Sequence, residues 1–96
     1  MILSFADDTT ADLYHGRDTK AARKIPKQIW NIAARKLDLL NGASRVEDLK
    51  IPPGNRLEKL SGDRVGQHSI RINNRWRICF RWVDGDAADV EIVDYH

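Results

Sequence analysis

The last thirty residues of the chain, 67–96, alternate between apolar and polar side chains with a period of two. This period is typical of antiparallel strands with one buried face, and the stretch is long enough for three consecutive strands. One phase is expected to face the core and contains Ile70, Ile72, Trp76, Ile78, Phe80, Trp82, Val90 and Ile92. The other phase contains Ser69, Arg71, Arg77, Cys79, Arg81, Val93 and Tyr95. The sequence therefore predicts a sheet with one core face and one open, cationic face.

The first turn of this sheet is predicted to be a three-residue loop, residues 73–75. Such a loop pairs Ile72 with Trp76, whereas a two-residue loop would put Arg77 on the core face. Asn, which supplies two of the loop residues, tolerates the left-handed backbone expected there. The same register sets Arg71 opposite Arg77, and facing like charges destabilise a sheet by up to about 1 kcal/mol. Because a sequence selected only for stability would avoid this pair, we expect the cationic face to bind an anion.

The rest of the chain predicts a strand and two helices ahead of a four-stranded sheet. Residues 1–5 form an apolar run that suits an edge strand, and a threonine-capped short helix follows over 9–15. The main helix is expected over 25–40, where apolar residues recur at helical spacing, and a short strand over 56–60. The predicted fold is α+β, with one domain spanning 1–96. In it the N-terminal strand and both helices pack on one face of a mainly antiparallel sheet.

Several classes of protein are disfavoured by what the sequence lacks. No apolar run approaches the roughly 20 residues of a membrane span, and the amino terminus does not resemble a signal peptide, so we expect a cytoplasmic protein with no membrane partner. The lone Cys79 excludes an internal disulfide; it is either a small strand residue or a thiol activated by its arginine neighbours. No glycine-rich nucleotide motif is present, and His15, His68 and His96 lack ligand-like spacing. We therefore expect no metal and no cofactor.

The sequence closes on Asp94, Tyr95 and His96, which we expect to lie beside Arg77, Arg71 and Arg81. Cleavage of RNA through its own 2′-hydroxyl needs a base, an acid and cations that stabilise the phosphorane, and these residue types can supply them. Three interpretations stay open on the residues alone: a nuclease site, a plain nucleic-acid-binding face, and a terminal histidine without a role. The further cations expected to contact RNA are Arg56, Lys59, Arg64, Arg71, Arg75 and Arg81.

The segment from Pro52 to His96 closely resembles the HigB-type toxins (the GraT branch) of the RelE/ParE superfamily. The resemblance is carried by PPGNRLEKLSGDRVGQHSIRINNRWRICFRW followed by DVEIVDYH, while the first half matches in pattern more than in residues. It implies a RelE-like fold and a bacterial toxin of a type II toxin–antitoxin pair. It also implies a ribosome-dependent endoribonuclease that cleaves mRNA in the ribosomal A site. The implied partner is a HigA-type antitoxin with a helix-turn-helix domain, and operator DNA would be bound only through that antitoxin.

Carried over residue by residue, the resemblance makes Arg77 the phosphate-stabilising arginine and Asp94, Tyr95 and His96 the catalytic triplet. Some HigB toxins have a catalytic histidine at the position of Glu58, so Glu58 is either the general base or an ion-pair partner of a neighbouring arginine. Two other functions remain open. One is a ParE-like toxin that poisons gyrase without cleaving RNA, and the other is a non-catalytic RNA-binding module.

Overall fold

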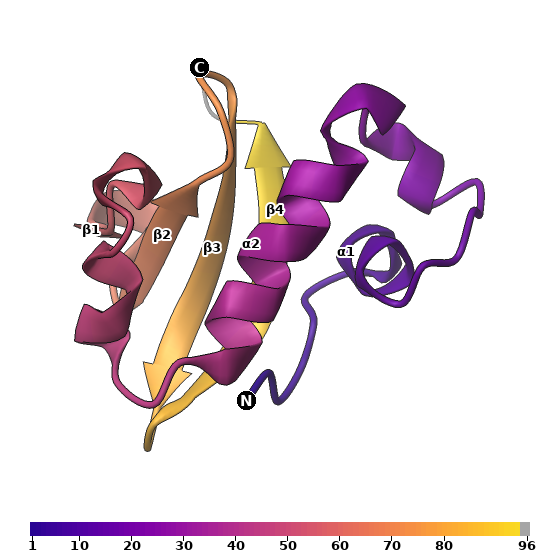
Figure 1. Ribbon diagram of the computed structural model, residues 1–96. Coiled ribbons are helices and arrows are strands. Elements are labelled where there is room, and N and C mark those ends of the chain that lie inside the picture. The colour runs from indigo at the N-terminus through magenta and orange to yellow at the C-terminus, as the bar shows by residue number, and fades with distance from the viewer. Residues whose placement is uncertain (95–96) are drawn as a thin grey trace.

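Four antiparallel strands in chain order form the sheet of the computed structural model, which describes residues 1–94 (Figure 1). The α+β class and the three consecutive C-terminal strands are confirmed. None of the helices within 1–94 is long and apolar enough to cross a membrane. The helices are α1 (Asp8–Tyr14) and α2 (Trp30–Gly42), and the strands are β1 (Glu58–Lys59), β2 (Gln67–Arg71), β3 (Trp76–Val83) and β4 (Asp86–Asp94). Short 3-10 turns span Ala22–Lys24, Lys27–Ile29, Val46–Lys50, Pro53–Asn55 and Gly62–Arg64.

The predicted register of β2 and β3 is confirmed, since Ile70 pairs with Ile78 and Arg71 with Arg77. The predicted left-handed backbone of the loop is wrong, because none of its three residues has a positive φ. Instead the Asn73 Oδ1 accepts hydrogen bonds from the backbone N–H groups of residues 75 and 76, at 2.9 and 2.8 Å. An asparagine side chain can close a turn in this way without a left-handed residue.

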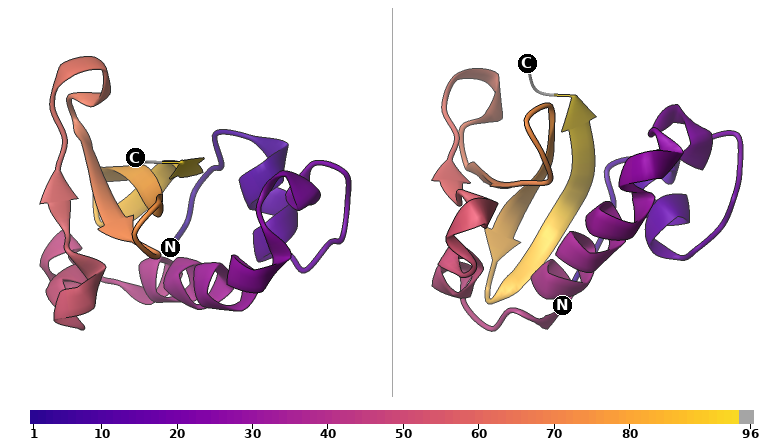
Figure 2. Two further views of the ribbon diagram at one scale, coloured as in Figure 1. Left: turned by 90° about the horizontal axis from the view of Figure 1, so that it is seen from above. Right: turned by 45° about the horizontal axis from the view of Figure 1, so that its top comes forward.

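Helix α2 crosses one face of the sheet, and α1 packs beside it at the β4 edge (Figures 1 and 2). The predicted apolar phase of the strands meets α2 in one core cluster. Its wholly buried members include Ala33, Leu37 and Leu40 from α2 and Ile70, Ile78, Phe80 and Val90 from the sheet. The apolar residues that recur at helical spacing and those that alternate along the strands therefore form one common core.

Both helices begin away from their predicted starts. The N-cap of α1 is Asp7, whose carboxylate accepts from the Thr10 backbone N–H at 2.8 Å. The predicted threonine cap is wrong because Thr10 is buried, and its hydroxyl accepts from the Ile92 backbone N–H of β4. Helix α2 begins at Trp30 rather than at residue 25, because Pro26 has an extended backbone and a 3-10 turn follows it.

The N-terminal segment runs parallel to β4 but forms only two isolated bridges, Ile2 with Ala87 and Phe5 with Val90. The predicted edge strand is thus reduced to a partial pairing. The interruption lies at Asp89, which has a φ of 52° and takes β4 out of the extended conformation. Its backbone N–H donates to the Ser4 hydroxyl at 2.9 Å instead of to a strand carbonyl.

The second face of the sheet is not simply open, which corrects the sequence prediction. Ser69 and Cys79 are fully buried there, although both belong to the phase expected to face solvent. The Arg77 side chain reaches Ser69 on this face, where its Nε donates to the Ser69 Oγ at 2.8 Å. Burial raises the pKa of the Cys79 thiol, so this residue is a small buried strand residue and not an activated thiol.

Candidate functional site

Arg77 is fixed in place by acceptors on two neighbouring segments. Its Nε donates to the Ser69 Oγ on β2 at 2.8 Å, and its Nη2 donates to the backbone carbonyl of Arg56 at 2.7 Å. The Glu58 carboxylate lies 3.9 Å from the same nitrogen, and the Arg77 side chain is only 12% exposed. A guanidinium held by hydrogen bonds to two segments is preorganised, because little side-chain freedom remains to be lost when an anion binds.

Arg71 and Arg77 stand opposite each other, yet their guanidinium groups have separate partners. Arg71 turns toward the loop, where its Nε donates to the Asn73 carbonyl at 3.0 Å and its Nη2 donates to the Asn74 side chain. These four residues line a pocket of about 360 Å³. Two guanidinium groups and two amides form a donor-rich lining that suits an anion such as phosphate.

The Arg56 carbonyl reaches Arg77 because the backbone at residue 56 is left-handed, with a φ of 46°. This conformation is uncommon outside glycine and ends the turn Pro53–Asn55. Asn55 anchors that turn from below: it is fully buried and its Nδ2 donates to the carbonyls of Leu49 and Ile51, at 3.2 and 3.3 Å. Lys36 of α2 donates to the Asn55 Oδ1, so α2 supports the turn that holds Arg77.

The sequence analysis missed Ser69, Asn55 and the Arg56 carbonyl as supports of the site. A small hydroxyl residue in the cationic phase of β2 was the available signal for Ser69, because it can accept hydrogen bonds from the charged residues beside it. The backbone carbonyl at residue 56 left no such signal, since its partner lies 21 positions away.

Asp94 lies at the end of β4 and is engaged by Arg75 through both carboxylate oxygens, at 2.8 Å each. In the β3–β4 register Asp94 pairs with Trp76, and the preceding Val93 pairs with Arg77. Strand β4 therefore brings Val93 and Asp94 to the neighbourhood of Arg77. The predicted catalytic residues Tyr95 and His96 lie outside the described residues.

The other predicted RNA contacts are spread over the sheet. Arg64 donates to Gln67 and Glu91, at 3.1 and 3.2 Å, and Arg81 donates to Asp89 at 3.4 Å. The Arg56 side chain is exposed near the site. Lys59 pairs with His68 in β1–β2, in the row that faces the helices, so the structure does not bring it to the face of Arg77.

His68 lies at the rim of the core rather than in the site. Its ring stacks on Phe80 with centroids 6.0 Å apart, and its Nδ1 is buried without a hydrogen-bond partner in the described part of the chain. Burial lowers the pKa of His68, and the nearby Lys59 lowers it further, against a smaller opposing effect of Glu47. His68 is thus kept neutral near physiological pH.

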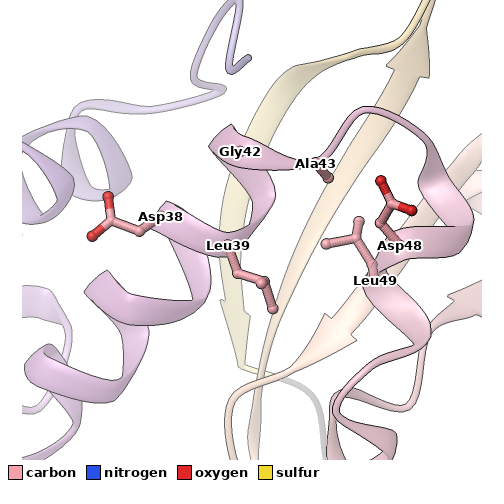
Figure 3. A pocket seen from close by; sticks show the side chains of 6 residues that line it. All are labelled: Asp38, Leu39, Gly42, Ala43, Asp48 and Leu49. Carbon is pink, nitrogen blue, oxygen red and sulfur yellow. The ribbon is translucent and has the colours of Figure 1, made fainter.

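Two further hollows lie along α2, away from Arg77. One, of about 270 Å³, sits between α2 and the turn Val46–Lys50 (Figure 3) and is lined by Asp38, Leu39, Gly42, Ala43, Asp48 and Leu49. The other, of about 300 Å³, shares Leu39 with it and adds Ile32, Arg35 and Lys36. The first hollow contains two carboxylates, of Asp38 and Asp48, and the second contains two cations, Arg35 and Lys36, but neither includes a predicted site residue. Within residues 1–94, no three His, Cys, Asp or Glu side chains are grouped so that they could hold a metal ion.

The sheet and its helices form a RelE-like fold. A solved structure, the YoeB-YefM complex from Staphylococcus aureus, contains a chain of the same fold with a TM-score of 0.60 and 17% identity. The match covers 100% of the present chain and 95% of that chain.

The family is defined by sequence comparison. Residues 3–96 match the model of the HigB-like toxins, described as the RelE-like toxin of the type II toxin–antitoxin system HigB, and the chain belongs to this family. Toxin HigB-1 of Vibrio cholerae is 46% identical over 89 residues, which cover 93% of this chain and 92% of that protein. Endoribonuclease HigB of Proteus vulgaris is 44% identical over 41 residues, 43% of this chain and 45% of that protein. Membership in a toxin–antitoxin family supports an antitoxin as partner.

Proposed function

We propose that this toxin is an endoribonuclease that cleaves mRNA on the ribosome and so inhibits translation. The observation that carries the proposal is the fixed Arg77 guanidinium beside Arg71, in a donor-lined pocket at the end of β4. A relative that matches 43% of this chain is named an endoribonuclease, which supports the same reaction here.

In the proposed reaction the 2′-hydroxyl of one nucleotide attacks the adjacent phosphorus and the 5′-oxygen of the next nucleotide leaves. Arg77 stabilises the charge that develops on the phosphorane oxygens, and Arg71 adds a second cation at the same pocket. Tyr95 and His96 are proposed to carry out proton transfer, as the family motif implies, because the imidazole titrates near neutral pH. Glu58 lies within ion-pair distance of Arg77, which favours its role as an ion-pair partner over that of a general base.

The proposal includes the ribosome as an obligatory partner, because a site built mainly from cations needs the RNA to be positioned by another surface. We further propose a HigA-type helix-turn-helix antitoxin as the neutralising partner, through which alone the complex would contact operator DNA. Because its substrate is translated mRNA, the site of action is the cytoplasm.

Mapping of new 5′ ends tests the function, in cells after induction and on purified ribosomes carrying a defined mRNA. The matched variants are Arg77→Ala and Arg23→Ala; Arg23 is an arginine whose partner, Asp18, lies outside the sheet. We expect new 5′ ends with the parent and with Arg23→Ala, and none with Arg77→Ala. An RNA-binding module would leave no new ends with any variant. A ParE-like gyrase poison would instead change supercoiling and leave the mRNA intact.

A further inference from the structure

A bidentate ion pair between Arg75 and Asp94 connects the β2–β3 loop to the last residue of β4. The Arg75 Nε donates to one oxygen of Asp94 and its Nη2 donates to the other, both at 2.8 Å. Among the ion pairs within residues 1–94, no other arginine donates through two nitrogens to both oxygens of one carboxylate. A bidentate pair restricts the orientation of both groups more than a single contact does.

A third group completes this arrangement, which we call the loop clamp (Arg75, Trp76 and Asp94). The Arg75 guanidinium carbon lies 5.9 Å from the centre of the Trp76 ring, within the range of a cation–π contact. Trp76 is itself the strand partner of Asp94. The Arg75 guanidinium thus contacts both members of the Trp76–Asp94 strand pair, although 61% of the Arg75 side chain remains exposed.

In the register of β3 and β4, the Asp94 carboxylate does not belong to the cross-strand row that contains Arg77. Asp94 lies in the row of Trp76, whereas Val93 lies in the row of Arg77. A carboxylate that is engaged at both oxygens and lies in the other row is poorly placed to take a proton from a phosphodiester bound at Arg77. Its geometry suits a structural role at the strand end.

We propose that Arg75 is a positioning residue that fixes the end of β4 through Asp94, and thereby holds the last described residues of that strand, Val93 and Asp94, in register beside Arg77. This inference rests on the proposed endoribonuclease function. It assigns Arg75 a role different from the RNA contact that its charge alone suggests. It also makes Asp94 the receiving half of the clamp instead of a proton-transfer group.

The two roles of Arg75 predict different kinetics. Loss of an RNA contact raises the ribosome concentration needed for half-maximal cleavage, whereas loss of positioning lowers kcat, because small misplacements of catalytic groups reduce rates by up to about 10²-fold. We expect Arg75→Ala to lower kcat by roughly 10- to 100-fold with half-saturation unchanged. Arg75→Lys should show most of this loss, because one ammonium group keeps the charge but does not reproduce the fork geometry.

The experiment compares these variants on ribosomes programmed with a defined mRNA under single-turnover conditions. The charge-swapped double variant, Arg75→Asp with Asp94→Arg, restores an ion pair at the same rung and should recover part of the lost rate. Arg23→Ala is the matched control, because it removes an arginine from another carboxylate pair, with Asp18. A higher half-saturating concentration at unchanged kcat in Arg75→Ala would make Arg75 an RNA contact and overturn the positioning role.

Amide hydrogen exchange of the β4 peptide supplies a readout that does not depend on cleavage. Exchange near residue 94 should accelerate in Arg75→Ala and stay unchanged in Arg23→Ala, because only the first variant releases the strand end. Unchanged exchange in both variants would also overturn the inference. If the parent protein left no new 5′ ends on ribosomes, the proposed function would fail, while the exchange result would still decide whether the clamp holds the strand end.

Discussion

Arg77 is the residue whose environment departs most from what its position in the sequence suggests. When two arginines face each other across strands, replacing one of them is expected to raise the stability of the sheet. Instead its guanidinium is nearly buried and donates to Ser69 and to the carbonyl of residue 56. The like-charge pair with Arg71 was predictable from register, but these acceptors were not, because a backbone carbonyl from a distant turn has no signature in residue types.

We therefore predict that Arg77→Ala abolishes cleavage and also lowers the free energy of unfolding. The substitution leaves the Ser69 hydroxyl and the Arg56 carbonyl without their donor, which corresponds to about 1–3 kcal/mol. Chemical denaturation measures the stability and growth inhibition measures the function. Arg77→Lys retains the charge but not the fork, so it should recover stability more than activity. If the alanine variant remained toxic, Arg77 would not be part of the functional site.

His68 gives the protein a pH-dependent stability. Its pKa in the folded state is below the ordinary value of 6.5, so the unfolded state binds the proton more readily. The stability from neutral His68 is fully present above pH 6.5 and is lost as the pH falls through the lower folded pKa. We expect the melting temperature to decrease on acidification below pH 6.5, and His68→Gln to reduce that decrease. An identical acid profile in parent and variant would show that His68 is not responsible.

At the scale of elements, the sheet was predictable where side-chain alternation decides the register, and the helix ends and turns were not. Strands β2 and β3 pair as expected because a slip by one residue would bury arginine. By contrast, α1 is capped by Asp7, one of several polar residues near its start that could have done so. The support that the Pro53–Asn55 turn gives to the site depends on buried contacts of Asn55, which the local sequence does not reveal.

The turn that ends at Asn55 yields a prediction of its own. Asn55→Ala leaves the Lys36 ammonium and two backbone carbonyls without partners in a buried site, so we expect a loss of about 2–3 kcal/mol of unfolding free energy. Cleavage should also decrease, because the turn no longer holds the carbonyl at Arg56 toward Arg77. Asn41→Ala is the control: it removes one exposed hydrogen bond, from Ile2, and should cost less. Equal losses in both variants would contradict this account.

At the scale of the whole molecule, the surface that carries Arg71 and Arg77 is rich in cations, and the pocket of about 360 Å³ on it is lined by Arg71, Asn73, Asn74 and Arg77 among the described residues. We predict that the purified toxin cleaves ribosome-bound mRNA much faster than the same RNA free in solution. The physical reason is that the ribosome would hold the RNA backbone in place, which a site built mainly from cations does not do by itself. Single-turnover rates on the two substrates give the comparison, and similar rates would show that the toxin positions RNA unaided.

The contact between Arg77 and residue 56 has a consequence for how such a site changes over evolutionary time. Arg77 uses only the backbone oxygen at that position, so the identity of the side chain is left free, provided that the left-handed conformation is retained. Glycine adopts this conformation without strain, and asparagine does so more readily than most residues. Residue 56 can therefore be replaced by other residue types while the Arg77 guanidinium still donates to the backbone carbonyl at that position. Alignments that score side chains would then rate as variable a position on which the site depends.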